Sequence, residues 1–158
     1  MALIPTRLQP GDAMCFAGDR RRFPIADAAT VIPQQWEQFM SRLPLPGQVG
    51  RDTYGITCDY SDGHIEYMAG VRVDCFDRLT QAHPEGRVNV PEATYAVFVH
   101  HGRNESIPKT WADIVEWVRN NDRYEDAQSP PLEIYGKQYD PVSNSSQFEI
   151  WYPVKAIG

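Results

Sequence analysis

Two glutamates near the C-terminus lie beside aromatic residues in segments that alternate like β-strands. Glu149 lies two positions before Trp151, and Glu133 lies two positions before Tyr135. Aromatic faces attract a cation by about 0.5–2 kcal/mol per ring, and a desolvated carboxylate favours a counter-charge. These residue types therefore indicate a site for a lipophilic cation. The alternative is a set of solvated glutamates on an open sheet face, since glutamate is mostly exposed in proteins.

Strand alternation predicts which of these side chains share a face. Glu149 and Trp151 share one face of their segment, and Glu133 and Tyr135 share one face of theirs. The opposite faces are apolar and are expected to enter the core. If the two segments pair as neighbouring strands, we expect all four side chains to line one surface.

The elements that position these residues follow from periodicity and from turn residues. Pro33 suits a first helical turn, Ser106 is a candidate helix cap, and residues 61–63 form a hairpin turn. We expect helices over 32–43 and 107–120, and strands over 6–8, 13–18, 53–60, 64–74, 87–90, 94–101, 132–139 and 147–155.

The order of these elements repeats along the chain. Ile32-Pro33-x-x-Trp36 matches Ile107-Pro108-x-x-Trp111, and Glu66 corresponds to Glu149. We therefore expect a single α+β domain over residues 1–158 with pseudo-repeats at about 3–75 and 85–156. Each repeat is a strand–strand–helix–strand–strand unit. Together they are expected to form a curved antiparallel sheet with two main helices on one side and a ligand groove between the halves. The alternative is chance similarity between common residues.

Composition excludes several classes of function. The chain has 158 residues and a net charge of −6, whereas a nucleic-acid surface normally shows a basic stripe. Residues 20–22 form its single basic run, which is typical of a solvated hairpin end. No window reaches the length of a membrane span, and the N-terminus does not resemble a signal peptide. We expect a cytoplasmic protein that makes no direct contact with nucleic acid or membrane.

Metal, disulfide and nucleophile chemistry have weak support in the sequence. Cys15, Cys58 and Cys75 are far apart without a CxxC motif, so we expect neither a disulfide nor a structural metal. His100 and His101 are adjacent, and a strand sends neighbours to opposite faces. Cys58 is a candidate nucleophile, but a lone cysteine in a strand is usually a packing residue. No cofactor is expected.

Several segments, spread over nearly the whole chain, resemble one known family in the right order. They are Tyr54-Gly55-Ile56 with Asp59-Tyr60, Glu66-Tyr67-Met68-Ala69-Gly70-Val71, Val90-Pro91-x-x-Thr94-Tyr95-Ala96-Val97-Phe98, Ile107-Pro108-x-x-Trp111 and Phe148-Glu149-Ile150-Trp151-Tyr152-Pro153-Val154. They resemble the GyrI-like small-molecule-binding family, the effector-binding domain of many AraC-type and MerR-type regulators.

The resemblance implies a duplicated α+β fold with an aromatic pocket between the halves. Family members that bind multiple drugs place a buried glutamate at the base of this pocket, facing a cationic lipophilic ligand. The family's glutamate before the last hairpin matches Glu133, and that of the last strand matches Glu149. The strand pattern here begins by about Thr6, which leaves no room for a helix-turn-helix and puts direct DNA binding in doubt.

Three functions remain open on the sequence. The first is a stand-alone module that binds cationic lipophilic compounds for drug resistance or regulation, acting with a separate regulator. The second is a hydrolase of small electrophilic compounds with Glu149 or Glu133 as general base, because desolvation raises a carboxyl pKa. The third is a protein-interaction module such as a gyrase inhibitor. In the first, which we favour over an enzyme, the ligand-binding residues are Glu133, Glu149, Tyr135 and Trp151, with Tyr67, Tyr95 and Trp117 as further wall residues.

Overall fold

The structure is a computed structural model that describes residues 3–79, 86–136 and 145–157. The chain divides into two compact units, which are not consecutive in sequence. Unit 1 comprises Met1–Ala13 and Pro91–Gly158, and unit 2 comprises Met14–Val90. Unit 1 is therefore built from both ends of the chain, whereas unit 2 is one continuous segment.

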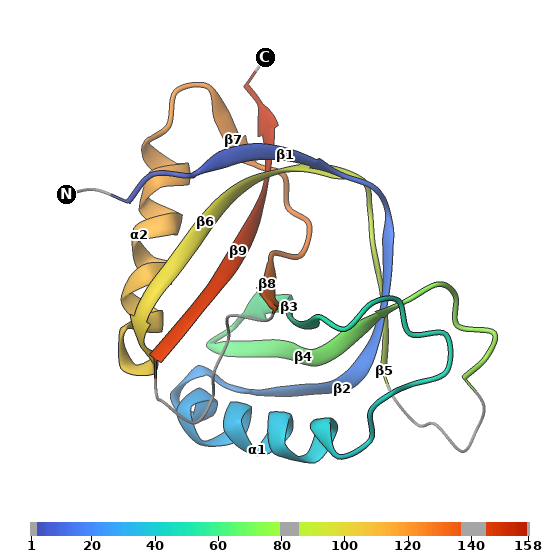
Figure 1. The fold of residues 1–158 in the computed structure, drawn as a ribbon. Coiled ribbons are helices and arrows are strands. Elements are labelled where there is room, and N and C mark those ends of the chain that lie inside the picture. The colour runs from blue at the N-terminus through green and yellow to red at the C-terminus, as the bar shows by residue number, and fades with distance from the viewer. Residues whose placement is uncertain (1–2, 80–85, 137–144, 158) are drawn as a thin grey trace. The chain divides into compact units, whose positions relative to one another are not determined.

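Unit 2 is an antiparallel sheet with a helix packed on one face (Figure 1). Its elements are β2 (Met14–Pro24), the 3-10 helix η1 (Ile25–Asp27), α1 (Ala28–Met40), β3 (Thr53–Ser61), β4 (His64–Val73) and β5 (Gly86–Val90). The strand order within the unit is β3-β4-β2-β5. The turn at Asp62 and Gly63, both with positive φ, joins β3 to β4 as the sequence predicts.

Unit 1 has the same arrangement of helix and sheet. Its elements are β1 (Arg7–Gly11), β6 (Ala93–Arg103), η2 (Asn104–Ser106), α2 (Ile107–Asn120), β7 (Tyr124–Asp126), β8 (Leu132–Tyr135) and β9 (Ser145–Ala156). The strand order is β1-β6-β9-β8, and β7 pairs with a further part of β9. The periodicity did not predict β7. The end of the strand expected over 132–139 lies outside the described residues.

The helices bury an apolar stripe against their sheets. In unit 2, Phe39 of α1 is fully buried against Ala17, Ala69 and Val71. In unit 1, Ile114 of α2 is fully buried in the cluster that contains the apolar face of β9. Full burial of one such side chain contributes about 1.5–3 kcal/mol, so these contacts fix each helix on its sheet.

The two helices begin differently although both carry an Ile-Pro pair. Pro108 occupies the first turn of α2, as its fixed φ favours. Pro33 lies inside α1, which begins at Ala28 and not at the expected Ile32. Ala28 and Ile32 both pack against the unit 2 core, so burial supports a turn of helix before the proline.

The α+β class expected from the sequence is confirmed. Both units contain a strand, a 3-10 turn, a helix and a closing antiparallel pair in the same chain order. This shared order supports the proposed duplication, which stays a prediction. The first strand of each expected repeat pairs elsewhere: β1 pairs with β6, and β5 pairs with β2.

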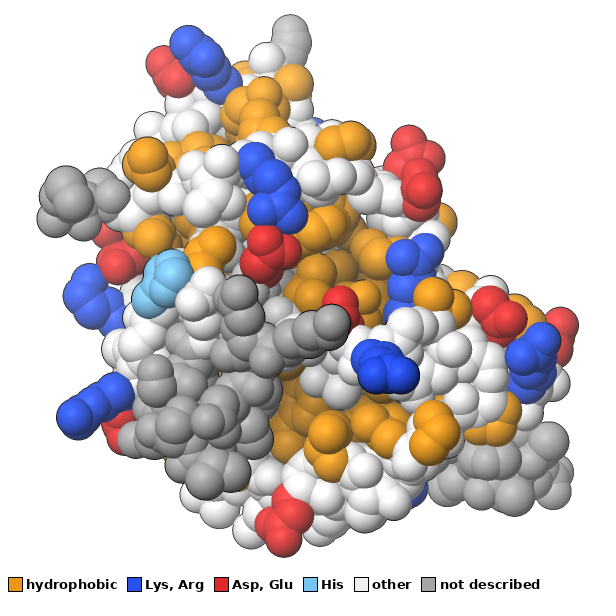
Figure 2. Space-filling view, in the orientation of Figure 1, with side chains coloured by type: hydrophobic (Ala, Val, Ile, Leu, Met, Phe, Trp, Pro, Cys, Tyr) orange, Lys and Arg blue, Asp and Glu red, His pale blue; other side chains and the backbone are white. Residues whose placement is uncertain are grey.

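Basic residues do not gather into one patch on the face that Figure 2 shows. On the face shown in Figure 2, Lys and Arg side chains occur singly or beside an acidic group. Arg20, Arg21 and Arg22 of the basic run each form an ion pair with an aspartate or glutamate of unit 2. Among the described residues, no helix is both long enough and apolar enough to cross a bilayer.

Candidate functional site

The pairing of β8 with β9 places the two predicted glutamates on opposite faces of the unit 1 sheet. Leu132 lies opposite Trp151, and Glu133 lies opposite Ile150. Directly opposed residues share a face, so Glu133 lies with the apolar side of β9 and Glu149 lies on the other side. The expectation that Glu133, Tyr135, Glu149 and Trp151 line one surface was therefore wrong.

Glu133 lies on the face of the sheet that α2 covers. Its side chain is 7% exposed, and the indole Nε1 of Trp111 donates a hydrogen bond to its Oε2 at 3.0 Å. The Trp111 ring lies edge-on to Tyr152, with centroids 6.5 Å apart. Tyr135, two residues after Glu133, packs against Phe148 with the ring centroids 4.6 Å apart. The result is a buried carboxylate in a largely aromatic environment, which we call the Glu133 cluster.

The opposite face of the unit 1 sheet carries Glu149, Trp151 and Tyr95. The Trp151 indole donates to Glu149 Oε1 at 3.0 Å, and the rings of Tyr95 and Trp151 have centroids 5.3 Å apart. Arg7 of β1 reaches the same carboxylate, with Nη1 2.9 Å from Oε2 and Nη2 3.3 Å from Oε1. We call this group the Glu149 cluster.

The ionisation of Glu149 depends on this geometry. Its partial burial raises the carboxyl pKa, but hydrogen bonds from Arg7 and Trp151 and the charge of Arg7 lower it further, so the net shift is downward. Glu149 is therefore a carboxylate at neutral pH. A general base that abstracts a proton near pH 7 needs a raised pKa, so this shift does not favour Glu149 in that role.

Tyr67 lies in unit 2 and is 4% exposed. It belongs to the core cluster beneath α1, and its hydroxyl accepts a hydrogen bond from Trp36 Nε1 at 3.1 Å. On the other face of the same strand, Glu66 accepts a hydrogen bond from Arg20 Nε at 2.9 Å. The structure thus gives Tyr67 a packing role beneath a helix.

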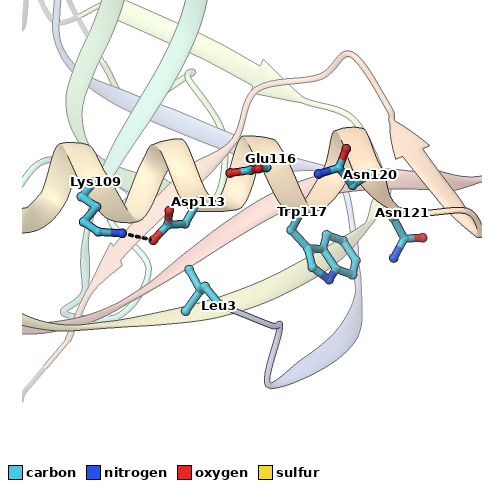
Figure 3. A pocket seen from close by; sticks show the side chains of 7 residues that line it. All are labelled: Leu3, Lys109, Asp113, Glu116, Trp117, Asn120 and Asn121. Atoms are coloured by element: carbon cyan, nitrogen blue, oxygen red, sulfur yellow. Dashed lines mark hydrogen bonds and ion pairs between the residues drawn. The ribbon is translucent and has the colours of Figure 1, made fainter. Parts of the chain in front are cut away.

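Trp117 lies on α2 and contacts Phe98 edge-on, with centroids 5.6 Å apart. It also lines an open groove of about 340 Å³ along the helix. Figure 3 shows Lys109 and Asp113 joined by an ion pair along this groove. The complete lining is Leu3, Lys109, Asp113, Glu116, Trp117, Asn120 and Asn121. Trp117 packs against the same apolar core of unit 1 as Trp111 and Tyr135.

Metal and thiol chemistry find little support in the described residues. None of their His, Cys, Asp and Glu side chains form a group of three or more that could hold a metal ion. Cys15, Cys58 and Cys75 are free thiols. Burial raises the pKa of Cys58 to about 11, which disfavours the nucleophilic thiolate.

Sequence reasoning did not assign roles to Trp111 and Arg7. The sequence did mark Trp111, because it is the last residue of the repeated Ile-Pro-x-x-Trp pattern. Trp36, at the same place in the other repeat, also donates a hydrogen bond to a strand residue, as Trp111 does. Arg7 carried no such signal, because its contact with Glu149 depends on the pairing of β1 with β6, whose partners, such as Arg7 and Val97, are distant in the sequence.

Comparison with known families identifies the domain. Residues 7–154 match the family model of Cass2, described as integron-associated effector binding protein. The chain belongs to this family. The match extends from β1 into β9, so it contains the Glu133 and Glu149 clusters of this Cass2 family member. The GyrI-like effector-binding domain expected from the sequence is confirmed.

A curated relative is a regulator. The Cass2 family chain is 28% identical over 128 residues to the transcriptional regulator BrlR of Pseudomonas aeruginosa. The match covers 78% of this chain and 46% of BrlR, so the chain spans about half the length of that relative.

Solved structures share the fold at low identity. The structure of SAV2435 bound to tetraphenylphosphonium has a TM-score of 0.73 and 19% identity, and the match covers 94% of this chain and 93% of that one. The integron cassette protein VCH_CASS2 of Vibrio cholerae has a TM-score of 0.69 and 16% identity, covering 98% of each chain. The EcmrR C-terminal domain has a TM-score of 0.65 and 18% identity, covering 96% and 97%.

Proposed function

We propose that this protein binds lipophilic aromatic cations and that Glu133 supplies the counter-charge. The observation that carries the proposal is the burial of the Glu133 carboxylate, 7% exposed, under the indole of Trp111. A carboxylate removed from water favours a positive partner. Aromatic rings add cation–π attraction to the same partner. SAV2435, which shares the fold, was solved with tetraphenylphosphonium, a ligand of this class.

The ring positions suit a ligand of this kind. Trp111 and Tyr152 approach each other edge-on, and Tyr135 lies against Phe148 on the same side of the sheet. Offset and edge-on contacts let rings pack against the aryl groups of a ligand. Because α2 covers Glu133, we infer that a ligand reaches it when the Trp111 side chain or the helix moves. Trp117, on the same helix, is a further wall residue of this site.

The family and the curated relative support a role in regulation. The family is described as integron-associated effector binding protein, and the BrlR relative is a transcriptional regulator. We propose that ligand binding here is linked to regulation or resistance in the cytoplasm, through a separate DNA-binding partner. The chain's net charge of −6 supports a partner-mediated contact with DNA over a direct one.

The test is a titration of tetraphenylphosphonium into wild type and Glu133→Gln. Glutamine keeps the shape of the side chain and its acceptor for Trp111 but removes the charge. Because breaking a buried charge pair costs a few kcal/mol, the Kd for tetraphenylphosphonium should rise by roughly ten- to a thousandfold. Neutral triphenylphosphine oxide should lose much less affinity. Glu92→Gln, at an exposed turn, removes the same charge as a matched control.

Three outcomes separate the alternatives. Equal losses for the cation and the neutral probe would assign Glu133 a structural role. No loss for either probe would place the charge at Glu149 or elsewhere. A cationic aryl ester that is hydrolysed by wild type and not by Glu133→Gln would support the hydrolase in place of the binding module.

A further inference from the structure

Arg7 lies where a bound cation would lie in the Glu149 cluster. Its guanidinium makes a two-pronged contact with the Glu149 carboxylate, at 2.9 and 3.3 Å. The same guanidinium lies over the Trp151 ring, 5.8 Å from its centroid. A counter-charge together with an aromatic face is the environment that recognises an external organic cation. Arg7 thus makes, from within the chain, both contacts expected of a cationic ligand.

The strand register produces this arrangement. Arg7 of β1 pairs with Val97 of β6, and Val97 pairs with Trp151 of β9, so the three side chains form a row across one face. Glu149 lies two residues before Trp151 on the same face. The guanidinium reaches diagonally over the indole, which itself donates to Glu149 Oε1.

The ion pair of unit 2 at the position that corresponds to Glu149 joins strands and has no tryptophan beside it in the strand. Arg20 donates to Glu66 from Nε and to the carbonyl of Arg87 from Nη1, so it ties strands together. Met68 occupies the position two residues after Glu66, where β9 has Trp151. Met68 is fully buried. Unit 2 therefore has the charge pair but a methionine at the position where unit 1 has the tryptophan.

Two features indicate that the occupant at Glu149 can be exchanged. The side chains of Arg7 and Glu149 are 41% and 34% exposed, so the guanidinium can leave into solvent. Its further hydrogen bond, from Nε to Gln9 Oε1, is long at 3.3 Å and stays within β1. Beside Trp151, the Tyr95 hydroxyl is buried and has no hydrogen-bond partner in the described structure.

Glu149 and Trp151 are predicted from the sequence as cation-binding residues, and we propose that Arg7 is an internal competitor for the cation at this second site. Lipophilic aromatic cations, including arylalkyl guanidinium compounds, bind there when the Arg7 side chain swings away. A ligand must therefore bind Glu149 and Trp151 more favourably than the Arg7 guanidinium does. The Tyr95 hydroxyl offers a hydrogen bond to a ligand that also carries a polar group. The ligand class rests on the proposed function, but the site is separate from Glu133.

The experiment measures tetraphenylphosphonium binding in a Glu133→Gln background, which removes the charge of the first site. Adding Arg7→Ala should lower the Kd by roughly three- to thirtyfold, because the ligand no longer competes with a half-exposed ion pair and its cation–π contact. Adding Glu149→Gln to that double variant should abolish the gain. Neutral triphenylphosphine oxide should not distinguish Arg7→Ala from its parent.

Lys155→Ala is the matched control. It removes one exposed cation of unit 1, paired with Glu125 at 3.8 Å, and should leave the Kd unchanged. Circular-dichroism melting curves confirm that each variant is folded.

No gain in affinity from Arg7→Ala, or a gain that persists with Glu149→Gln, overturns the inference. If wild type fails to bind and Arg7→Ala binds, the role of Glu133 fails and the Arg7 inference stands. If no variant binds, both fail.

Discussion

Trp111 and Glu133 are joined by a hydrogen bond of 3.0 Å from the indole Nε1 to the carboxylate. Trp36, which ends the matching Ile-Pro-x-x-Trp segment of α1, donates instead to the hydroxyl of Tyr67 at 3.1 Å. Both tryptophans therefore tie their helix to the sheet beneath it. The partner is a hydroxyl in unit 2 and a carboxyl group in unit 1, so the common contact has an ionisable partner in unit 1 alone.

Replacing these tryptophans by phenylalanine should have unequal effects on stability. Trp111→Phe removes the donor from a buried carboxylate, which should lower the free energy of unfolding by about 1.5–3 kcal/mol beyond the loss of ring area. Trp36→Phe removes a neutral hydrogen bond, for which about 0.5–1.5 kcal/mol is expected. Urea denaturation followed by circular dichroism measures both. Equal losses would show that the charge of Glu133 contributes little to the contact.

The buried His100 should make stability depend on pH. Burial lowers the pKa of His100, and the hydrogen bond to the Arg103 carbonyl opposes this shift only in part. The unfolded chain then binds more protons than the folded one between the lowered pKa and about 6.5. Stability should therefore fall as the pH drops through 6.5. His100→Gln should flatten this dependence between pH 7.5 and 5.

The neighbour His101 provides the matched control for that measurement. It is exposed and contributes only part of the lowering of the His100 pKa, so His101→Gln should flatten the pH dependence less than His100→Gln does. A dependence that is the same in both variants would assign it to other titrating groups.

Gly18 should tolerate no side chain. A Cβ at this position would overlap the carbonyl of Ala69 and lie 2.6 Å from the Cα of Gly70, both backbone atoms of the neighbouring strand. Gly18→Ala should destabilise the protein by at least about 3 kcal/mol, the upper range for overpacking. Gly63→Ala meets no atom within 4 Å and strains only a positive φ of 73°, so about 1–2 kcal/mol is expected. Thermal melting would contradict this if Gly63→Ala were the more damaging change.

Cys58 should react slowly in the folded protein. Burial raises its pKa to about 11, and the nearby Arg20 lowers it by less. At pH 8 a thiol with this pKa is about 0.1% thiolate, against roughly a quarter for an unperturbed cysteine. Iodoacetamide should therefore alkylate Cys58 about a hundredfold faster in urea than in buffer, as measured by mass spectrometry of its peptide. Similar rates in the two conditions would reveal an accessible thiolate.

Much of the fold follows from local signals. The Gly63 turn, the proline at the start of α2 and the alternation around Ile150 each specify an element from a few neighbouring residues. The family resemblance adds the class of the fold. The placement of Trp151 on the face opposite Ile150 also follows, because strand alternation is a local property.

The site was harder to predict because it depends on register between strands. A shift of one residue in the register between β8 and β9 decides whether Glu133 lies opposite Trp151 or Ile150. The amino-acid sequence of neither strand specifies that register. The contact of Arg7 with Glu149 requires β1 to pair with β6. Long-range pairing of this kind has no signature within either segment.

The position of β1 has a consequence for the order in which the protein is assembled during synthesis. Unit 2 is complete once Val90 has emerged from the ribosome, since it is continuous from Met14. Strand β1 is made first but has no partner in its own unit until β6 has followed. Closing so long a loop is slow compared with local pairing, so β1 should dock late. Arg7 travels with this strand, and its contact with Glu149 forms only after β9, the last strand to be made, has joined β6.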